Sequence, residues 1–128
     1  MVKKRCIQDV SFVHLDWVEG EEGIVNRQLQ ANALVAYIDS LGLPSIIIGD
    51  FNCTPVSPTM RYFEKEGFLF ADKGKDKLSF QDDEQVEIDH LIYRDSNGIK
   101  FEIKSIDLLD RPIVSDHRPL LAELSVVF

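Results

Sequence analysis

Four short polar segments of the sequence carry side chains that could bind a phosphate, hold a metal ion or move a proton. Each segment follows or interrupts a run of apolar residues, which is where a strand of a sheet is expected to end. Such strand ends are the usual location of sites in α/β proteins. The candidates are His14, Asp50 with Asn52, Asp89, and Asp116 with His117.

Two of these segments also have an ordinary structural explanation. Asp50 and Asn52 flank Phe51 directly after an apolar strand, and alternation places both polar side chains on one side. The pair could equally form an Asx turn that caps the strand end. Asp116 and His117 could form a surface turn. Each segment, taken alone, leaves both explanations open.

Asp89 is harder to explain as a structural residue. It lies among apolar residues in the stretch 88–93, where burying a carboxylate without a partner is costly. Because side chains alternate along a strand, His90 points away from the face that Asp89 occupies, and His90 is therefore predicted to be structural. His14 ends an apolar strand, and a structural histidine is the usual outcome at such a position.

The elements that must position these residues alternate between strands and helices. Apolar residues at helical spacing predict a helix over residues 24–41, after an acidic loop at 19–23. Ser57 and Pro58 predict a second helix that ends near residue 66. Together with the strands, this order predicts an α/β layered domain. Strands are predicted at 6–13, 45–49, 88–93, 99–104 and 120–127, with a short one at 78–81 and a turn at 95–98.

Composition narrows the class of protein. A length of 128 residues predicts a single domain, 1–128. The formal net charge of −8 argues against a protein that binds nucleic acid tightly through its phosphates alone. No apolar run approaches the length of a membrane span. The two cysteines, Cys6 and Cys53, suggest reduced thiols and a cytoplasmic location.

The four polar segments occur in an order that resembles the endonuclease/exonuclease/phosphatase superfamily of metal-dependent phosphoesterases. The resemblance extends from about residue 11 to the end of the chain, and Gly-Asp-Phe-Asn followed by Ser-Asp-His-Arg-Pro is its most specific part. The segments are Val13-His14-Leu15-Asp16, Gly49-Asp50-Phe51-Asn52, Ile88-Asp89-His90-Leu91-Ile92 and Ser115-Asp116-His117-Arg118-Pro119.

This resemblance implies a role for each candidate. His117 matches the catalytic histidine and Asp89 the carboxylate that orients it. Asp50 matches the residue that orients or deprotonates the attacking water, with a second role at the metal. The implied reaction is attack of water on the phosphorus of a phosphoester. Substrates in such a family include nucleic acid, phospholipid and small phosphate esters.

The resemblance also implies a metal ion and donors to the phosphate. Asp116 matches a metal ligand, together with Asp50, for Mg²⁺ or Mn²⁺. Asn52 and His14 match donors to the phosphoryl oxygens. A zinc site built from His14, His117 and a carboxylate is a weaker alternative, because its spacing matches no compact zinc motif.

The resemblance is to the carboxy-terminal half of the family's fold. That fold is a four-layer α/β/β/α sandwich, so this chain is expected to supply one mixed β-sheet with helices on one face. The other sheet face is then expected to lie bare, which predicts a homodimer or pairing with a separate amino-terminal half. The amino-terminal half also supplies a metal-binding glutamate, so the active site is expected to be incomplete and the isolated chain weak or inactive. The alternative function is a non-catalytic fragment or interaction module.

Overall fold

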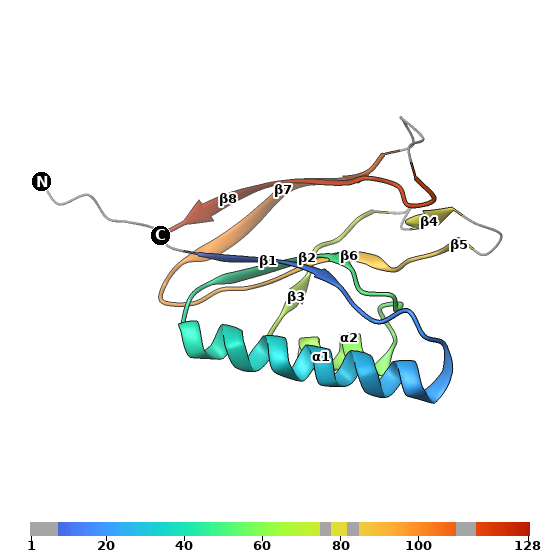
Figure 1. The fold of residues 1–128 in the computed structure, drawn as a ribbon. Helices are drawn as coiled ribbons and strands as arrows, with labels where there is room; N and C mark the ends of the chain where they lie inside the picture. The colour runs from blue at the N-terminus through green and yellow to red at the C-terminus, as the bar shows by residue number, and fades with distance from the viewer. Residues whose placement is uncertain (1–7, 75–77, 82–84, 110–114) are drawn as a thin grey trace, which may run out of the picture.

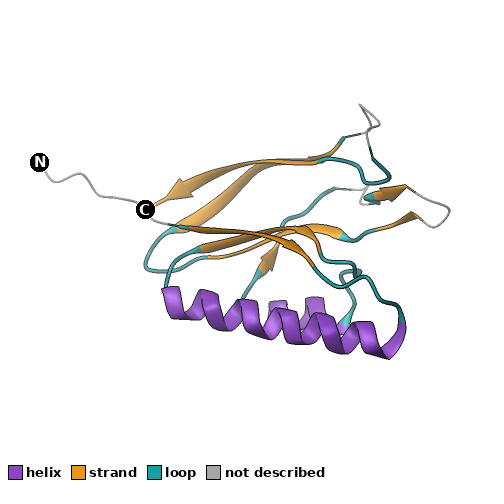
Figure 2. Ribbon diagram, viewed as in Figure 1, coloured by secondary structure: helices purple, strands orange, loops and turns teal. Residues whose placement is uncertain are grey.

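The structure is a computed structural model that describes residues 8–74, 78–81, 85–109 and 115–128 of the chain. Strands and helices alternate in its first half, and strands dominate the second half (Figures 1 and 2). The elements are β1 (Asp9–His14), α1 (Gly20–Leu41), β2 (Ser45–Asp50), α2 (Pro58–Lys65), β3 (Leu69–Phe70), β4 (Phe80–Gln81), β5 (Gln85–Val86), β6 (Asp89–Arg94), β7 (Lys100–Leu108) and β8 (Leu120–Val127).

A four-stranded mixed sheet forms the middle layer, with the strands in the order β1-β2-β6-β3. β1 runs parallel to β2, whereas β6 is antiparallel to both β2 and β3. The register pairs His14 with Asp50, and Asp50 with Asp89. Three of the candidate residues therefore lie in one row, at the same edge of three neighbouring strands.

β1 and β2 approach each other closely at Gly49. Its φ is 146°, and a Cβ at this position would lie 2.2 Å from the carbonyl oxygen of Val13. No side chain fits that gap, so glycine is required there. The next residue in each strand is His14 or Asp50, and the close approach of the two backbones brings these two side chains together.

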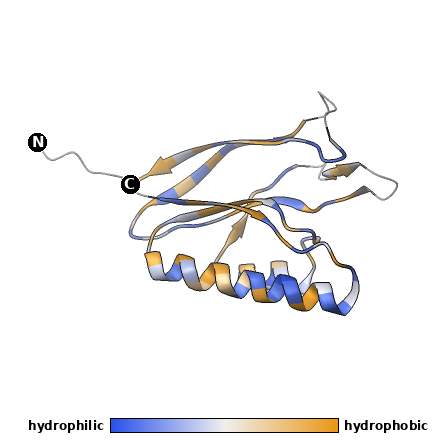
Figure 3. Ribbon diagram, viewed as in Figure 1, coloured by the Kyte–Doolittle hydropathy of each residue, from blue (hydrophilic) through white to orange (hydrophobic). Residues whose placement is uncertain are grey.

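Both helices cover the same face of the sheet (Figure 1). Apolar and polar residues are mixed along α1 (Figure 3), and its buried side chains include Ala31, Val35 and Ile38. These side chains pack in one core cluster with Ile47 of β2 and Phe63 of α2. The predicted α/β class, with a mixed sheet and helices on one face, is confirmed.

α1 begins at Gly20, so the prediction of a loop over residues 19–23 is wrong. Two glutamates in the first turn favour the helix, because their carboxylates interact favourably with its dipole. Gly23 is buried, and a Cβ there would come 1.6 Å from the carbonyl oxygen of Val18. The glycine thus permits the incoming chain to pass close to the helix.

The second helix and the hairpin turn agree with the sequence pattern. Ser57 caps α2, because its hydroxyl accepts a hydrogen bond from the backbone N–H of Met60 at 3.4 Å. Asn97 and Gly98 both have positive φ in the turn before β7. β3 was not predicted. The strand predicted at 6–13 lies partly outside the described residues.

β7 and β8 form an antiparallel ribbon that lies over the sheet face opposite the helices (Figure 1). A second core cluster joins the ribbon to the sheet, and it includes Ile46, Leu91 and Phe101. Ile46 is 8% exposed and Leu91 only 1%. The expectation that this face lies bare is therefore wrong for its centre. The strands after residue 99 fold back over the sheet instead of extending it.

β1 keeps exposed apolar side chains on the same face. Val10 is 45% exposed and Phe12 is 83% exposed. Val13, whose side chain alternates to the other face, packs against the helix-side core. Within the described residues, neither helix is both long and apolar enough to cross a membrane.

Candidate active site

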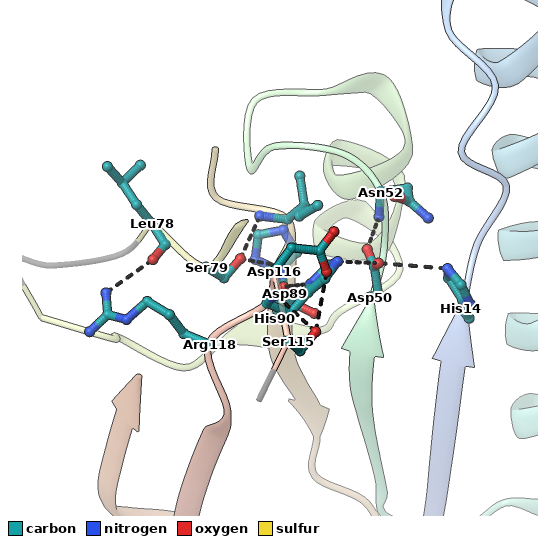
Figure 4. Close-up of polar contacts among 12 residues, drawn as sticks. His14, Asp50, Asn52, Leu78, Ser79, Asp89, His90, Ser115, Asp116 and Arg118 are labelled. Atoms are coloured by element: carbon teal, nitrogen blue, oxygen red, sulfur yellow. Dashed lines mark hydrogen bonds and ion pairs between the residues drawn. The ribbon is translucent and has the colours of Figure 1, made fainter. Parts of the chain in front are cut away.

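The row of His14, Asp50 and Asp89 at the sheet edge forms the floor of the site (Figure 4). His14 extends toward Asp50, and the distance from its Nε2 to Asp50 Oδ2 is 3.6 Å. The His14 side chain is 74% exposed, whereas that of Asp50 is 16% exposed. The row therefore runs from solvent at β1 to a half-buried carboxylate at its centre.

Asp89, at one end of this row, forms a close pair with His117. The distance between Asp89 Oδ2 and His117 Nδ1 is 2.7 Å, within the range of a charge-assisted hydrogen bond. Because a carboxylate only accepts, Nδ1 carries the proton and Nε2 of the neutral ring is left as an acceptor. That Nε2 lies 3.5 Å from Asp50 Oδ2. One nitrogen is thus fixed and the other is directed at Asp50, as in an Asp–His dyad.

The His117 ring is held from two further sides. Its backbone forms an isolated bridge with Phe80 of β4, and the two rings meet edge to face with centroids 5.1 Å apart. The Ser115 hydroxyl accepts a hydrogen bond from the His117 backbone N–H at 3.1 Å. The side chain is nevertheless 29% exposed, so the ring is both oriented and accessible.

The neighbouring carboxylates shift the pKa of His117. Burial lowers this pKa, but the Asp89 hydrogen bond and the charges of Asp89, Asp50 and Asp116 raise it by more. The net effect is a His117 pKa above its ordinary value of 6.5. A histidine with a shifted pKa at a strand edge is a common mark of proton-transfer chemistry.

The pKa of Asp50 is raised, which is an unusual direction for a carboxylate. Burial raises its pKa, and the charge of Asp89 adds to this effect. The backbone N–H of Asn52, which donates to Asp50 Oδ1 at 2.8 Å, opposes the shift only in part. The folded protein therefore disfavours the ionised form of Asp50.

Asn52 is held by its own turn. It has a φ of 50°, and its side-chain Nδ2 donates to the carbonyl oxygen of Leu15 at 2.6 Å. With the bond from its backbone N–H to Asp50, this is the Asx turn that the spacing allows. The turn also places Asn52 on the wall of a cleft of about 390 Å³, which His117, Trp17 and Phe80 help to line.

Asp116 is exposed beside the dyad. Its Oδ1 accepts a hydrogen bond from the Ser115 hydroxyl at 3.2 Å. The described residues contain one set of ligand atoms close enough to share a metal ion, from Asp50, Asp89 and His117, all within 4.8 Å of one another. Asp116 and His14 lie outside that set. The assignment of Asp116 with Asp50 as metal ligands stays a prediction.

Two residues inside the motifs, each next to a site carboxylate in the sequence, point into the core. Phe51 is fully buried and His90 is 4% exposed. The alternation that places Asp50 and Asp89 in the site therefore places their neighbours behind it. Trp17 is 74% exposed.

Ser79 is a site residue that the sequence did not reveal. Its buried hydroxyl accepts hydrogen bonds from the backbone N–H groups of Ile88 and Asp89, at 3.1 and 3.0 Å. Its carbonyl oxygen accepts from the backbone N–H of Arg118 at 2.8 Å. Ser79 thus ties the Asp89 strand to the segment that carries His117. The only relevant signal was the short strand predicted at 78–81.

The chain belongs to the endonuclease/exonuclease/phosphatase family, because the family model matches residues 6–117. No curated protein sequence matches the chain.

Several solved structures have the same fold at 22% sequence identity. The human Nocturnin catalytic domain with a bound sulfate anion has a TM-score of 0.74, covering 92% of this chain and 47% of that one. A protein of unknown function from Enterococcus faecalis has a TM-score of 0.71, with coverage of 91% and 49%. A mannosyl-6-phosphatase from Bacteroides thetaiotaomicron has a TM-score of 0.66, with coverage of 91% and 50%. The chain spans about half the length of these structures.

Proposed function

We propose that this chain carries the proton-transfer half of an enzyme that hydrolyses phosphoesters by attack of water on phosphorus. The observation that supports this most is the Asp89–His117 hydrogen bond of 2.7 Å, with His117 Nε2 facing Asp50 Oδ2 at 3.5 Å. A structural histidine would have no need of a second carboxylate opposite its free nitrogen. Membership of the endonuclease/exonuclease/phosphatase family supports this chemistry.

The side chains of the site divide the tasks of the reaction in this proposal. Asp50 orients the attacking water, and His117 Nε2 accepts its proton while the water oxygen bonds to phosphorus. The bond from phosphorus to the leaving-group oxygen breaks, and the leaving alcohol takes up a proton from the imidazolium or from solvent. Asp89 keeps the proton on Nδ1 and stabilises the imidazolium that forms. His14 and Asn52 donate to the phosphoryl oxygens, where negative charge grows in the transition state.

Asp50 and Asp116 would hold a divalent cation, Mg²⁺ or Mn²⁺. Their carboxylate oxygens are hard donors of the kind that these ions prefer. The raised pKa of Asp50, which arises from burial and the nearby Asp89, fits a cluster of acids that a cation would relieve. When bound, the cation stabilises charge on the phosphoryl or leaving-group oxygen.

The substrate we propose is a small phosphate ester, in preference to long nucleic acid or phospholipid. The net charge of −8 opposes tight binding to a polyanion. One relative of the same fold is a mannosyl-6-phosphatase, which is a precedent for a small sugar phosphate.

Hydrolysis of bis-p-nitrophenyl phosphate tests the proposal. The isolated chain is expected to release p-nitrophenol slowly with Mg²⁺ or Mn²⁺ and to fall to the buffer rate when EDTA removes the metal. Ca²⁺ at the same concentration controls for the effect of ionic strength. A rate that is the same with and without EDTA would exclude a metal-dependent reaction.

A pairing function is the second candidate, and Phe12 favours it. A phenylalanine that is 83% exposed in the middle of an edge strand is a typical interface side chain. Since the chain covers only 47% to 50% of its structural relatives, we propose that β1 binds either a second copy or a separate amino-terminal half.

Sedimentation velocity at micromolar concentration tests this pairing. The chain is expected to sediment as a dimer, or as a complex when an amino-terminal half from a relative is added. Phe12→Glu is expected to weaken either association at least tenfold, because it places a charge in an apolar contact. Leu121→Glu, at a 59% exposed position of β8, is the matched control. A monomer at all concentrations, with and without the added half, would contradict the proposal.

A further inference from the structure

A lysine is buried directly behind the dyad. The side chain of Lys73, in the loop after β3, is only 3% exposed. Among the described residues, the acceptors around its Nζ include Glu87 Oε2 at 2.8 Å, the Asp89 carbonyl oxygen at 2.7 Å and His90 Nδ1 at 3.0 Å. An ammonium group has three N–H donors, so each can be assigned one of these acceptors.

The lysine fixes the state of His90. Because an ammonium only donates, His90 Nδ1 must be the acceptor, and the proton of the neutral ring lies on Nε2. That Nε2 donates to the carbonyl oxygen of Cys53 at 2.8 Å. Burial and the nearby ammonium lower the pKa of His90 to about 4, in agreement with a neutral ring. The imidazole therefore works as a fixed bridge with one acceptor and one donor.

This bridge connects the two strand ends that form the site. Lys73 holds the carbonyl oxygen of Asp89, whose backbone N–H is already held by the Ser79 hydroxyl. His90 holds Cys53, the residue after Asn52. Its ring also meets Phe51 edge to face, with centroids 5.4 Å apart. Both backbone segments are thus attached to one buried cluster.

Filling a core with such a cluster costs more free energy than filling it with apolar side chains. Taking an ammonium and a carboxylate out of water carries a penalty that apolar packing of the same volume would avoid. Removing one partner alone leaves a buried polar group unsatisfied. The cluster holds the backbone at Asp89 and at Cys53. These contacts suggest that the cluster serves to position the residues of the site.

We propose that Lys73 and His90 are positioning residues, which hold the Asp89 backbone and the Asn52 turn at the separation that the reaction requires. This inference rests on the proposed phosphoester hydrolysis. Neither residue touches the substrate. Their contribution is to keep Asp89 aimed at His117 while Asp50 and Asn52 stay opposite, and loss of such outer contacts commonly lowers activity by about 10- to 100-fold.

Two substitutions of His90 separate positioning from packing. His90→Phe keeps an aromatic ring against Phe51 but removes both hydrogen bonds. His90→Gln keeps one acceptor for Lys73 and one donor for Cys53. We expect kcat for bis-p-nitrophenyl phosphate to fall about 10- to 100-fold in His90→Phe, with KM changed by less than about threefold, and to recover at least tenfold in His90→Gln.

An NMR measurement makes the test independent of turnover. The His117 Nδ1 proton, held by Asp89 at 2.7 Å, is expected to give a resolved downfield resonance in the wild type and in His90→Gln. In His90→Phe it is expected to broaden or move upfield, because Asp89 is no longer held. Lys73→Met is expected to behave as His90→Phe does.

The outcomes distinguish the two proposals. A wild type without Mg²⁺-dependent turnover, whose His117 resonance still responds to His90→Phe, would reject hydrolysis by this chain alone and keep the positioning role. An unchanged His117 resonance and an unchanged kcat in folded His90→Phe would overturn the positioning role. If His90→Phe does not fold, His90→Gln and Lys73→Met decide, because equal kcat in the wild type and folded Lys73→Met would also overturn it.

Discussion

Replacing His117 with alanine is expected to lower kcat for bis-p-nitrophenyl phosphate by a factor of about 10² to 10⁴ while the chain still folds. That range is typical for loss of a positioned group that moves a proton. The ring is 29% exposed and lies at the rim of the fold, so its removal leaves only a small gap. The measurement is kcat at saturating Mg²⁺, with thermal melting as the check on folding.

The pH dependence identifies the role of the histidine. Since Nε2 must be free to accept a proton, activity is expected to rise with pH through the His117 pKa, which the acidic neighbours hold above 6.5. Asp89→Asn removes the hydrogen-bonding carboxylate and its charge, and is expected to move this acid limb to lower pH. An acid limb that stays in place in Asp89→Asn, or a His117→Ala variant with full activity, would contradict the dyad.

Asp50→Asn is expected to lower the proposed hydrolytic activity at least about 100-fold and, at the same time, to raise the melting temperature by a few degrees. Burial raises the pKa of Asp50, and Asp89 adds to the effect, so ionisation of this carboxyl is less favourable in the folded than in the unfolded chain. Above the folded pKa this difference reduces stability. Asparagine keeps an oxygen for the Asn52 backbone N–H but carries no charge.

The pH dependence of the gain in melting temperature tests whether ionised Asp50 reduces stability. The gain in melting temperature is expected to be full at pH 7 and to shrink as the pH falls through the folded pKa of Asp50, where the wild type also becomes neutral. Asp107→Asn, at an exposed position of β7, controls for the loss of one negative charge. A lower melting temperature for Asp50→Asn than for Asp107→Asn at pH 7 would show that the ionised Asp50 carboxylate does not reduce stability.

The sequence indicated which polar side chains lie close together better than it indicated how the last strands pack on the sheet. Asp50 and Asp89 stand out because a carboxylate after or within an apolar strand is costly to bury, and the register does place them side by side. Alternation also predicted that His90 faces away from Asp89, and His90 lies in the core. These predictions depend on the alternation of side chains between the two faces of a single strand, which the local sequence determines.

Contacts between distant segments could not be predicted in the same way. β7 and β8 have the alternation of a half-exposed hairpin, which is compatible with extending the sheet or with covering it. Only the packing of Phe101 against Leu91 and Ile46 decides between them. Ser79 and Lys73 come from a polar stretch that looks like an exposed loop, and their burial depends on partners that lie 9 to 17 positions away along the chain.

The close approach of β1 and β2 at Gly49 affects how variants of this protein will be interpreted. A saturation screen scored by activity would mark Gly49 as intolerant as the acids and the imidazole, although glycine has no group that could react. A Cβ there would meet Val13 at 2.2 Å and spread the first two strands apart, which would carry His14 out of reach of Asp50. Sensitivity at that position would report on backbone spacing, and only a side-by-side measurement of folding could tell it from a loss of chemistry.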